Sequence, residues 1–145
     1  MSVTTEEAHE SEIVTCWLPL VDVTENMGAL QIYPDVAPMK QLLPTNTGVR
    51  SGLILPETLP PHPPLSMPMK AGDVLLISAF TPHRSTPNRS PLAQWSLDLR
   101  FQPTGTHSGR AHLPSFVVRS QDPSKEERDF DAWSASWAGA QGWPR

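Results

Sequence analysis

The sequence of this 145-residue chain contains almost no cysteine and no long apolar run. Its one cysteine, Cys16, excludes a disulfide within the chain and favours a reducing, cytoplasmic environment. No apolar stretch approaches the roughly 20 residues that span a bilayer, so we expect no membrane partner. A lone cysteine cannot build a structural zinc site, and the spacing of the five histidines matches no zinc motif.

An excess of basic charge is absent as well. Eleven Lys and Arg residues against fifteen Asp and Glu give a net charge of -4, and the pI is about 5.7. This balance leaves no basic surface, so we expect no nucleic-acid partner. The first twelve residues, MSVTTEEAHESE, are acidic and polar. They are expected to be disordered, and their chemistry differs from that of a secretory or mitochondrial signal.

Proline is abundant instead, with 17 residues against a single tyrosine. Because proline interrupts helices and central strands, short strands joined by stiff loops are expected. The length fits one domain. We place it at residues 13–138, between the disordered N-terminus (1–12) and a short tail (139–145).

The pattern of β-formers and turn residues predicts an all-β fold with one C-terminal helix. We expect main strands at 13–23, 29–33, 67–69, 74–80 and 95–102, the last alternating apolar and polar as a half-buried strand does. Weaker strands are expected at 52–55 and 116–118, turns at 24–28 and 71–73, and a polyproline-like loop at 55–65. Asp122-Pro123-Ser124 is expected to cap a helix over 125–138. Such a set is typical of a sandwich or a jelly-roll-type barrel.

Residues 70–103, KAGDVLLISAFTPHRSTPNRSPLAQWSLDLRFQP, are the most informative stretch. A glycine turn begins an apolar strand, His83 follows it, and a second strand returns after a polar loop. Imidazole is the commonest metal ligand among protein side chains. A single histidine is more often only a polar residue at a strand end, so the surrounding stretch must decide between the two.

This stretch resembles the phytanoyl-CoA dioxygenase family of Fe(II)/2-oxoglutarate oxygenases. The likeness continues upstream in TCWLPLVDVTENMGALQIYP, residues 15–34, and downstream in GRAHLPSFVVRS, residues 109–120. It covers about residues 13–137. The resemblance implies a partial double-stranded β-helix, a cupin-like jelly roll, in which Fe(II) and 2-oxoglutarate are the cofactors.

In that family iron is held by two histidines and one carboxylate. The resemblance implies that His83 is the downstream histidine of this set. The family's His-x-Asp motif stands some fifteen residues or more before the strand of Trp17, a position that would precede residue 1. The nearest candidate is His9-Glu10-Ser11, which has serine in place of the carboxylate and is explained equally well as part of a solvated acidic tail.

The resemblance also implies three cosubstrate-binding positions, Trp17, Ser85 and Gln94. For Trp17 a core role is an equal alternative, and for Ser85 a turn role. Gln94 stands where the family has an arginine that pairs with the distal carboxylate of 2-oxoglutarate, and glutamine carries no charge. Arg84, Arg89 and Arg100 are no obvious replacements.

Three functions stay open at this point. In the first, the chain is the C-terminal portion of an oxygenase that hydroxylates a small organic substrate. In the second, it is a non-catalytic jelly-roll subunit of a catalytic partner. In the third, it is a fragment without independent function. By itself it is expected to be inactive, because one imidazole does not hold Fe(II) tightly. Exposed sheet edges favour homo- or hetero-oligomers.

Overall fold

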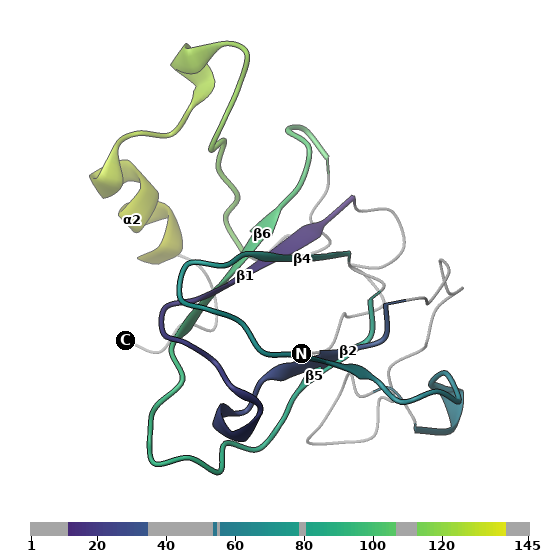
Figure 1. Cartoon of the computed structure of the whole chain (residues 1–145). Helices are drawn as coiled ribbons and strands as arrows, with labels where there is room; N and C mark the ends of the chain where they lie inside the picture. Colours follow the sequence, from purple (N-terminus) through teal and green to yellow (C-terminus); the bar gives the residue numbers. More distant parts are fainter. Residues whose placement is uncertain (1–11, 35–53, 55, 79–80, 107–112, 139–145) are drawn as a thin grey trace.

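The computed structural model describes residues 12–34, 54, 56–78, 81–106 and 113–138. In these residues two three-stranded antiparallel sheets lie one above the other, and a helix lies to one side of them (Figure 1). The expectation of a mostly-β chain with a C-terminal helix is therefore confirmed. The expected disorder of residues 1–12 and the tail at 139–145 fall almost wholly outside the described residues.

The first sheet has the strand order β4-β1-β6. Its central strand is β1 (Val14–Pro19), with β4 (Leu75–Ser78) on one side and β6 (Ser96–Phe101) on the other. β1 is buried at four of its six positions. A strand with a neighbour on both sides needs apolar, β-forming residues such as these, because it has little contact with water.

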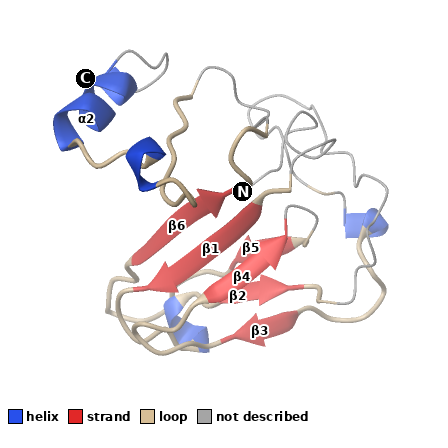
Figure 2. Ribbon diagram, turned by 90° about the horizontal axis from the view of Figure 1, so that it is seen from above, coloured by secondary structure: helices blue, strands red, loops and turns tan. Residues whose placement is uncertain are grey.

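The second sheet has the order β3-β2-β5. Its strands are β2 (Leu30–Ile32), β3 (Leu65–Met67) and β5 (His83–Ser85), each three residues long. Figure 2 shows this sheet beneath β1 and β6. Its residues thus form the opposite wall of the space that the first sheet faces.

The link from β1 to β2 crosses between the sheets and contributes most of the buried core residues. It contains the 3-10 helix η1 (Glu25–Met27) and Gly28, whose φ is +88°. The turn expected at 24–28 is thereby confirmed, including the need for positive φ at glycine. The buried cluster consists of five side chains from β1, the link and β2: Trp17, Val23, Met27, Ala29 and Leu30.

Asp22 ties this link to the turn before β4. Its carboxylate accepts hydrogen bonds from the backbone N–H of Ala71 and from Nζ of Lys70, both at 2.9 Å. The Ala71 N–H, and then the Lys70 ammonium, lower the pKa of Asp22 below its ordinary value. The predicted turn at 71–73 is confirmed, with Gly72 at a φ of +87° and the N–H of Asp73 bonded to the carbonyl oxygen of Lys70.

Several predicted strands need correction. The strand expected at 13–23 ends at Pro19, and the one expected at 67–69 lies at Leu65–Met67, with only a bridge between Met69 and Val23 beyond it. Residues 116–118 form no strand, and β5 was not expected. The strand proposed at 52–55 falls outside the described residues except for residue 54, which is not in a strand. The loop at 55–65 contains one 3-10 turn, η3 (Pro56–Thr58).

The C-terminal helix is shorter than expected. Asp122 caps only the 3-10 turn η4 (Pro123–Lys125), where its side chain accepts from the N–H of Ser124. The α-helix α2 begins later, at Phe130–Ala138, because Asp129 accepts from the N–H groups of Asp131 and Ala132 and so caps it. None of the described helices is long and apolar enough to cross a bilayer.

Candidate functional site

β5 directs two of the predicted site residues into the space between the sheets. In its antiparallel pairing with β2, His83 lies opposite Ile32 and Ser85 lies opposite Leu30. Opposite residues of an antiparallel pair share one face of the sheet. Ile32 and Leu30 are both buried, so His83 and Ser85 stand on the inner face, with His83 half-buried and Ser85 exposed.

The imidazole of His83 is held in one tautomer. Its Nδ1 lies 2.9 Å from the carbonyl oxygen of Thr81. A carbonyl oxygen only accepts, so Nδ1 carries the proton and donates. In the neutral ring Nε2 then keeps its lone pair, which is the arrangement of a metal-ligating histidine whose other nitrogen is fixed by a backbone carbonyl.

Arg84 points to the other face of the same strand. Its Nε donates to Oε1 of Gln31 at 2.8 Å, and Gln31 is the residue opposite Arg84 in β2. Arg84 is thus engaged on the outer face and is no substitute for a cosubstrate-binding arginine beside His83. Arg89 is likewise tied at its backbone, where its N–H donates to the carbonyl oxygen of Asn26.

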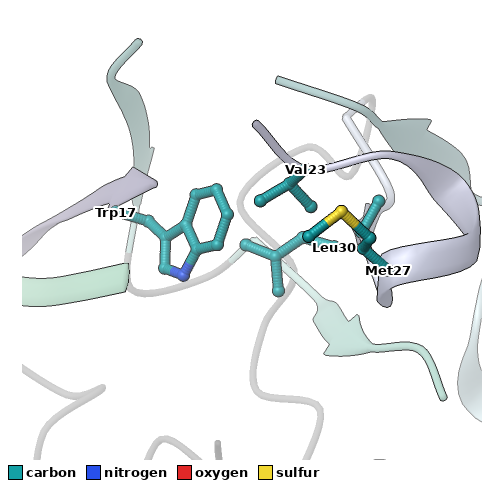
Figure 3. Close-up of a cluster of buried hydrophobic side chains, with 5 residues drawn as sticks. Trp17, Val23, Met27 and Leu30 are labelled. Atoms are coloured by element: carbon teal, nitrogen blue, oxygen red, sulfur yellow. The ribbon is translucent and has the colours of Figure 1, made fainter. Parts of the chain in front are cut away.

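Trp17 is a core residue. Only 6% of it is exposed, and its indole ring packs with Val23, Met27 and Leu30 (Figure 3). Leu30 lies opposite Ser85. Leu30 therefore links Trp17 to the inner face of β5, on which Ser85 and His83 lie. The burial of Trp17 also favours its role as a core residue.

Gln94 lies against the η1 turn rather than in open space. With its amide nitrogen turned toward the two carbonyl oxygens, it donates to Met27 at 3.0 Å and to Gly28 at 3.2 Å. This orientation is required because carbonyl oxygens cannot donate. Thr86 contacts the same segment, since its hydroxyl donates to the carbonyl oxygen of Ala29. Gln94 is thus a turn-capping residue in this structure.

β6 adds two charged residues to the inner face, and the sequence alone does not identify either of them as an inner residue. Asp98 lies opposite Trp17, and Arg100 lies opposite Thr15, so both share the face of the buried Trp17 and Thr15. The sequence alone names Arg100 only as a possible replacement for the missing arginine and does not single out Asp98. The signal that finds them is the register of β6 against β1, because alternation alone does not tell which face is inner.

On the inner faces of the two sheets the described residues supply one histidine, His83. In them no group of three or more His, Cys, Asp or Glu side chains could hold a metal ion. Iron of the two-histidine, one-carboxylate type needs three donors, so these residues by themselves do not fit it. His9 and Glu10 lie outside the described residues, and Glu12 is exposed just before β1.

Comparison with known proteins decides the family. The profile of the family described as phytanoyl-CoA dioxygenase matches residues 3–93, well over half of the chain. The chain belongs to the phytanoyl-CoA dioxygenase family. It is accordingly a member of an oxygenase family, as the resemblance in residues 15–34 and 70–103 implied.

Two curated relatives are hydroxylases. The chain is 34% identical over 122 residues to 1-deoxypentalenic acid 11-beta-hydroxylase of Streptomyces arenae, a match that covers 77% of this chain and 43% of the relative. It is 41% identical over 64 residues to the enzyme of the same name from Streptomyces exfoliatus, covering 42% of this chain and 23% of that relative. The chain thus spans less than half the length of these relatives. No solved structure matches it.

Proposed function

We propose that this chain is the jelly-roll portion of an Fe(II)/2-oxoglutarate-dependent oxygenase that hydroxylates a small organic substrate. Its fold supports this: two antiparallel sheets with the orders β4-β1-β6 and β3-β2-β5 face each other across a shared core, as in a double-sheet jelly roll. We place the domain at residues 13–138 and the protein in the cytoplasm. Two relatives are named for 1-deoxypentalenic acid, so small organic acids are the first compounds to test.

The observation that carries the proposal is the fixed tautomer of His83. Nδ1 is bonded to Thr81, and this leaves Nε2 as the nitrogen able to bind a metal on the inner face. We propose that His83 is one iron ligand and that the other two come from outside the described residues. When bound, iron would supply the oxygen-activating chemistry, and His83 would contribute one fixed donor.

The three residues predicted to bind the cosubstrate are supported to different degrees. Ser85, one position further along the same inner face, supports a hydroxyl contact to 2-oxoglutarate. Trp17 would form the apolar floor beneath it, reached through Leu30. Gln94 would act indirectly, by holding the carbonyl groups of Met27 and Gly28 in place.

The test begins upstream of the codon for Met1. We expect an in-frame His-x-Asp there, and a protein extended to include it should consume 2-oxoglutarate with Fe(II). His83→Ala should then lower turnover at least about a hundredfold, since loss of a fixed metal ligand removes the centre. His62→Ala is the matched control, because His62 is exposed and its Nδ1 lies next to the carbonyl oxygen of Pro63.

The 145-residue chain alone should neither bind stoichiometric Fe(II) under anaerobic conditions nor consume 2-oxoglutarate. If the chain alone does both, the idea that its other ligands lie elsewhere is wrong. If an extended protein works equally well without His83, the assignment of His83 is wrong.

A second function is favoured by Gln94. An amide occupies the position of the family's arginine, and its donors already serve the turn at Met27 and Gly28. We therefore keep a non-catalytic jelly-roll protein, one that stabilises a partner or binds a small molecule, as the alternative. Absence of an upstream His-x-Asp, together with no 2-oxoglutarate consumption, would favour it.

A further inference from the structure

We propose that the outer face of the sheet β4-β1-β6 is the interface between two copies of this chain, which pack face to face. Thr15, Trp17 and Ile77 are buried and mark the inner side of this sheet, toward β2, β3 and β5. The proposed contact is made by side chains of the opposite, outer face rather than by backbone groups at a strand edge. This inference does not depend on the proposed iron site.

The strand register determines which side chains form the outer face. In β1, Cys16 lies opposite Leu76 of β4 and Leu99 of β6. Because side chains alternate along a strand, residues two positions away lie on the same side. Within the three strands the outer face consists of Val14, Cys16, Leu18, Leu76, Ser78, Leu97, Leu99 and Phe101. None of these eight residues carries a charge, whereas Asp98 and Arg100 point to the inner side.

This apolar face is exposed. Five of its residues are 41–64% exposed: Val14, Leu76, Leu97, Leu99 and Phe101. Leu20, Val74 and Trp95 continue the same alternation just beyond the strand ends and are more than half exposed. Together these make up eight of the thirteen large apolar residues that are exposed in the described part of the chain. The helix α2 does not cover the face, since it lies beside β6 rather than over β1 in both Figure 1 and Figure 2.

The exposed area of this face is that of a protein interface. A large apolar residue has roughly 200 Å² of accessible surface, so eight residues that are about half exposed leave on the order of 800 Å². The largest apolar patch on a typical monomer is smaller, about 300–600 Å². One partner in a standard stable interface contributes about 800 Å². Two copies of the face therefore supply the area that a stable dimer buries.

A second copy is the partner that matches the chemistry of this face. An uncharged surface meets its own copy without repulsion, and a two-fold pair is closed, so no face is left over for a third copy. Two sheets that pack face to face lie about 10 Å apart with their side chains interdigitated. At that spacing the Cys16 residues of the two copies, at the centre of the face, are too far apart for a disulfide. The dimer is therefore non-covalent.

The test is sedimentation of the 145-residue chain with a reductant present, at concentrations from about 1 to 100 μM. The mass should rise to twice 16.0 kDa and stop there. Leu76→Glu places an unpaired carboxylate in the apolar contact twice by symmetry, so it should raise the dissociation constant at least about a hundredfold. Leu92→Glu is the matched control, because Leu92 is 62% exposed against 64% for Leu76 but lies in the loop whose Arg89 contacts Asn26 of η1. It should change the dissociation constant less than about threefold.

A second measurement keeps the test valid if Leu76→Glu folds poorly. Trp95 is 64% exposed and lies two residues before Leu97, so the dimer should shield its indole ring from solvent. Iodide quenching of tryptophan fluorescence reports this shielding, and the contribution of Trp95 is the difference between the parent and Trp95→Phe, which keeps an apolar ring on the face. The quenching of Trp95 should fall at least about twofold from the lowest to the highest concentration, because the centre of an interface excludes water.

A parent chain that stays monomeric at every concentration overturns the proposal, and so does association that continues beyond the dimer. A dimer that Leu76→Glu leaves intact, or in which iodide still reaches Trp95, assigns the contact to another surface and overturns it too. A longer form of the protein that is monomeric and shields Trp95 at every concentration also overturns it, because a further segment of the same chain then covers the face.

Discussion

Replacing Gly28 with alanine is expected to destabilise the fold more than the same replacement at Gly72. Both glycines have nearly the same φ, +88° and +87°. They differ in their surroundings. A Cβ on Gly28 would lie 2.7 Å from the carbonyl oxygen of Thr86 and 3.3 Å from the backbone nitrogen of Asn88, whereas nothing lies within 4 Å of a Cβ on Gly72.

The magnitude follows from two separate costs. Left-handed backbone costs a non-glycine residue about 1–2 kcal/mol, and both variants share this cost. Only Gly28→Ala adds a steric cost, because 2.7 Å to backbone is too close and the segment after β5 must move; overpacking of this kind costs about 1–3 kcal/mol. We therefore expect a loss of about 2–5 kcal/mol at Gly28 and about 1–2 kcal/mol at Gly72.

Urea unfolding monitored by tryptophan fluorescence measures the difference. With a slope of about 1–3 kcal/mol per molar urea, the midpoint of Gly28→Ala should lie clearly below that of Gly72→Ala. Gly105→Ala, at +87° and equally open, should behave like Gly72→Ala. Equal midpoints for Gly28→Ala and Gly72→Ala would refute the close packing of the segment after β5 against Gly28.

Three further predictions concern the core, the turn and acid stability. Trp17→Ala should cost about 3–5 kcal/mol, read from urea unfolding, because it empties the centre of the core; a loss below about 1 kcal/mol would contradict that placement. Gln94→Glu should cost more than about 1 kcal/mol at neutral pH, since a carboxylate cannot donate to the turn carbonyls, and an unchanged melting temperature would refute the capping role. The pKa of Asp22 is lowered by the N–H of Ala71 and by Lys70, so its contribution to stability is present above the unfolded pKa of about 3.9 and is lost as pH falls further. Asp22→Asn should reduce the loss of unfolding free energy as pH falls below the unfolded pKa of Asp22. An unchanged pH dependence there would contradict the stabilising role of the Asp22 carboxylate.

The parts of the fold that rest on local signals were predictable from sequence. The turns at 24–28 and 71–73 are predictable because glycine readily takes a positive φ. The strand at 95–102 is predictable because its residues alternate and include strong β-formers. β5 was not predictable, because His83-Arg84-Ser85 contains no strong β-former and becomes a strand only by pairing with β2, some fifty residues away. The C-terminal helix was placed too early because Asp122 and Asp129 are both competent caps, and local sequence does not choose between them.

The site was only partly predictable for a similar reason. The stretch around His83 and its family likeness indicate that histidine, but its tautomer depends on the carbonyl oxygen of Thr81 lying 2.9 Å from Nδ1, which the sequence does not show. Alternation in β6 predicted a half-buried strand without telling which side faces inward. The register against β1 turns Asp98 and Arg100 inward and the apolar side chains outward, a reversal that only tertiary pairing reveals.

The protonation of the His83 ring tests the proposed metal-binding role of this histidine most directly. A nitrogen-15 NMR spectrum of the chain's histidine side chains, recorded at about pH 8.5, above the ordinary histidine range, reports which ring nitrogen carries the proton. We predict the proton on Nδ1 of His83 and an unprotonated Nε2, with His83→Ala used to assign the signals. A ring protonated on Nε2 would contradict this role, because the nitrogen proposed to bind iron would then be a donor.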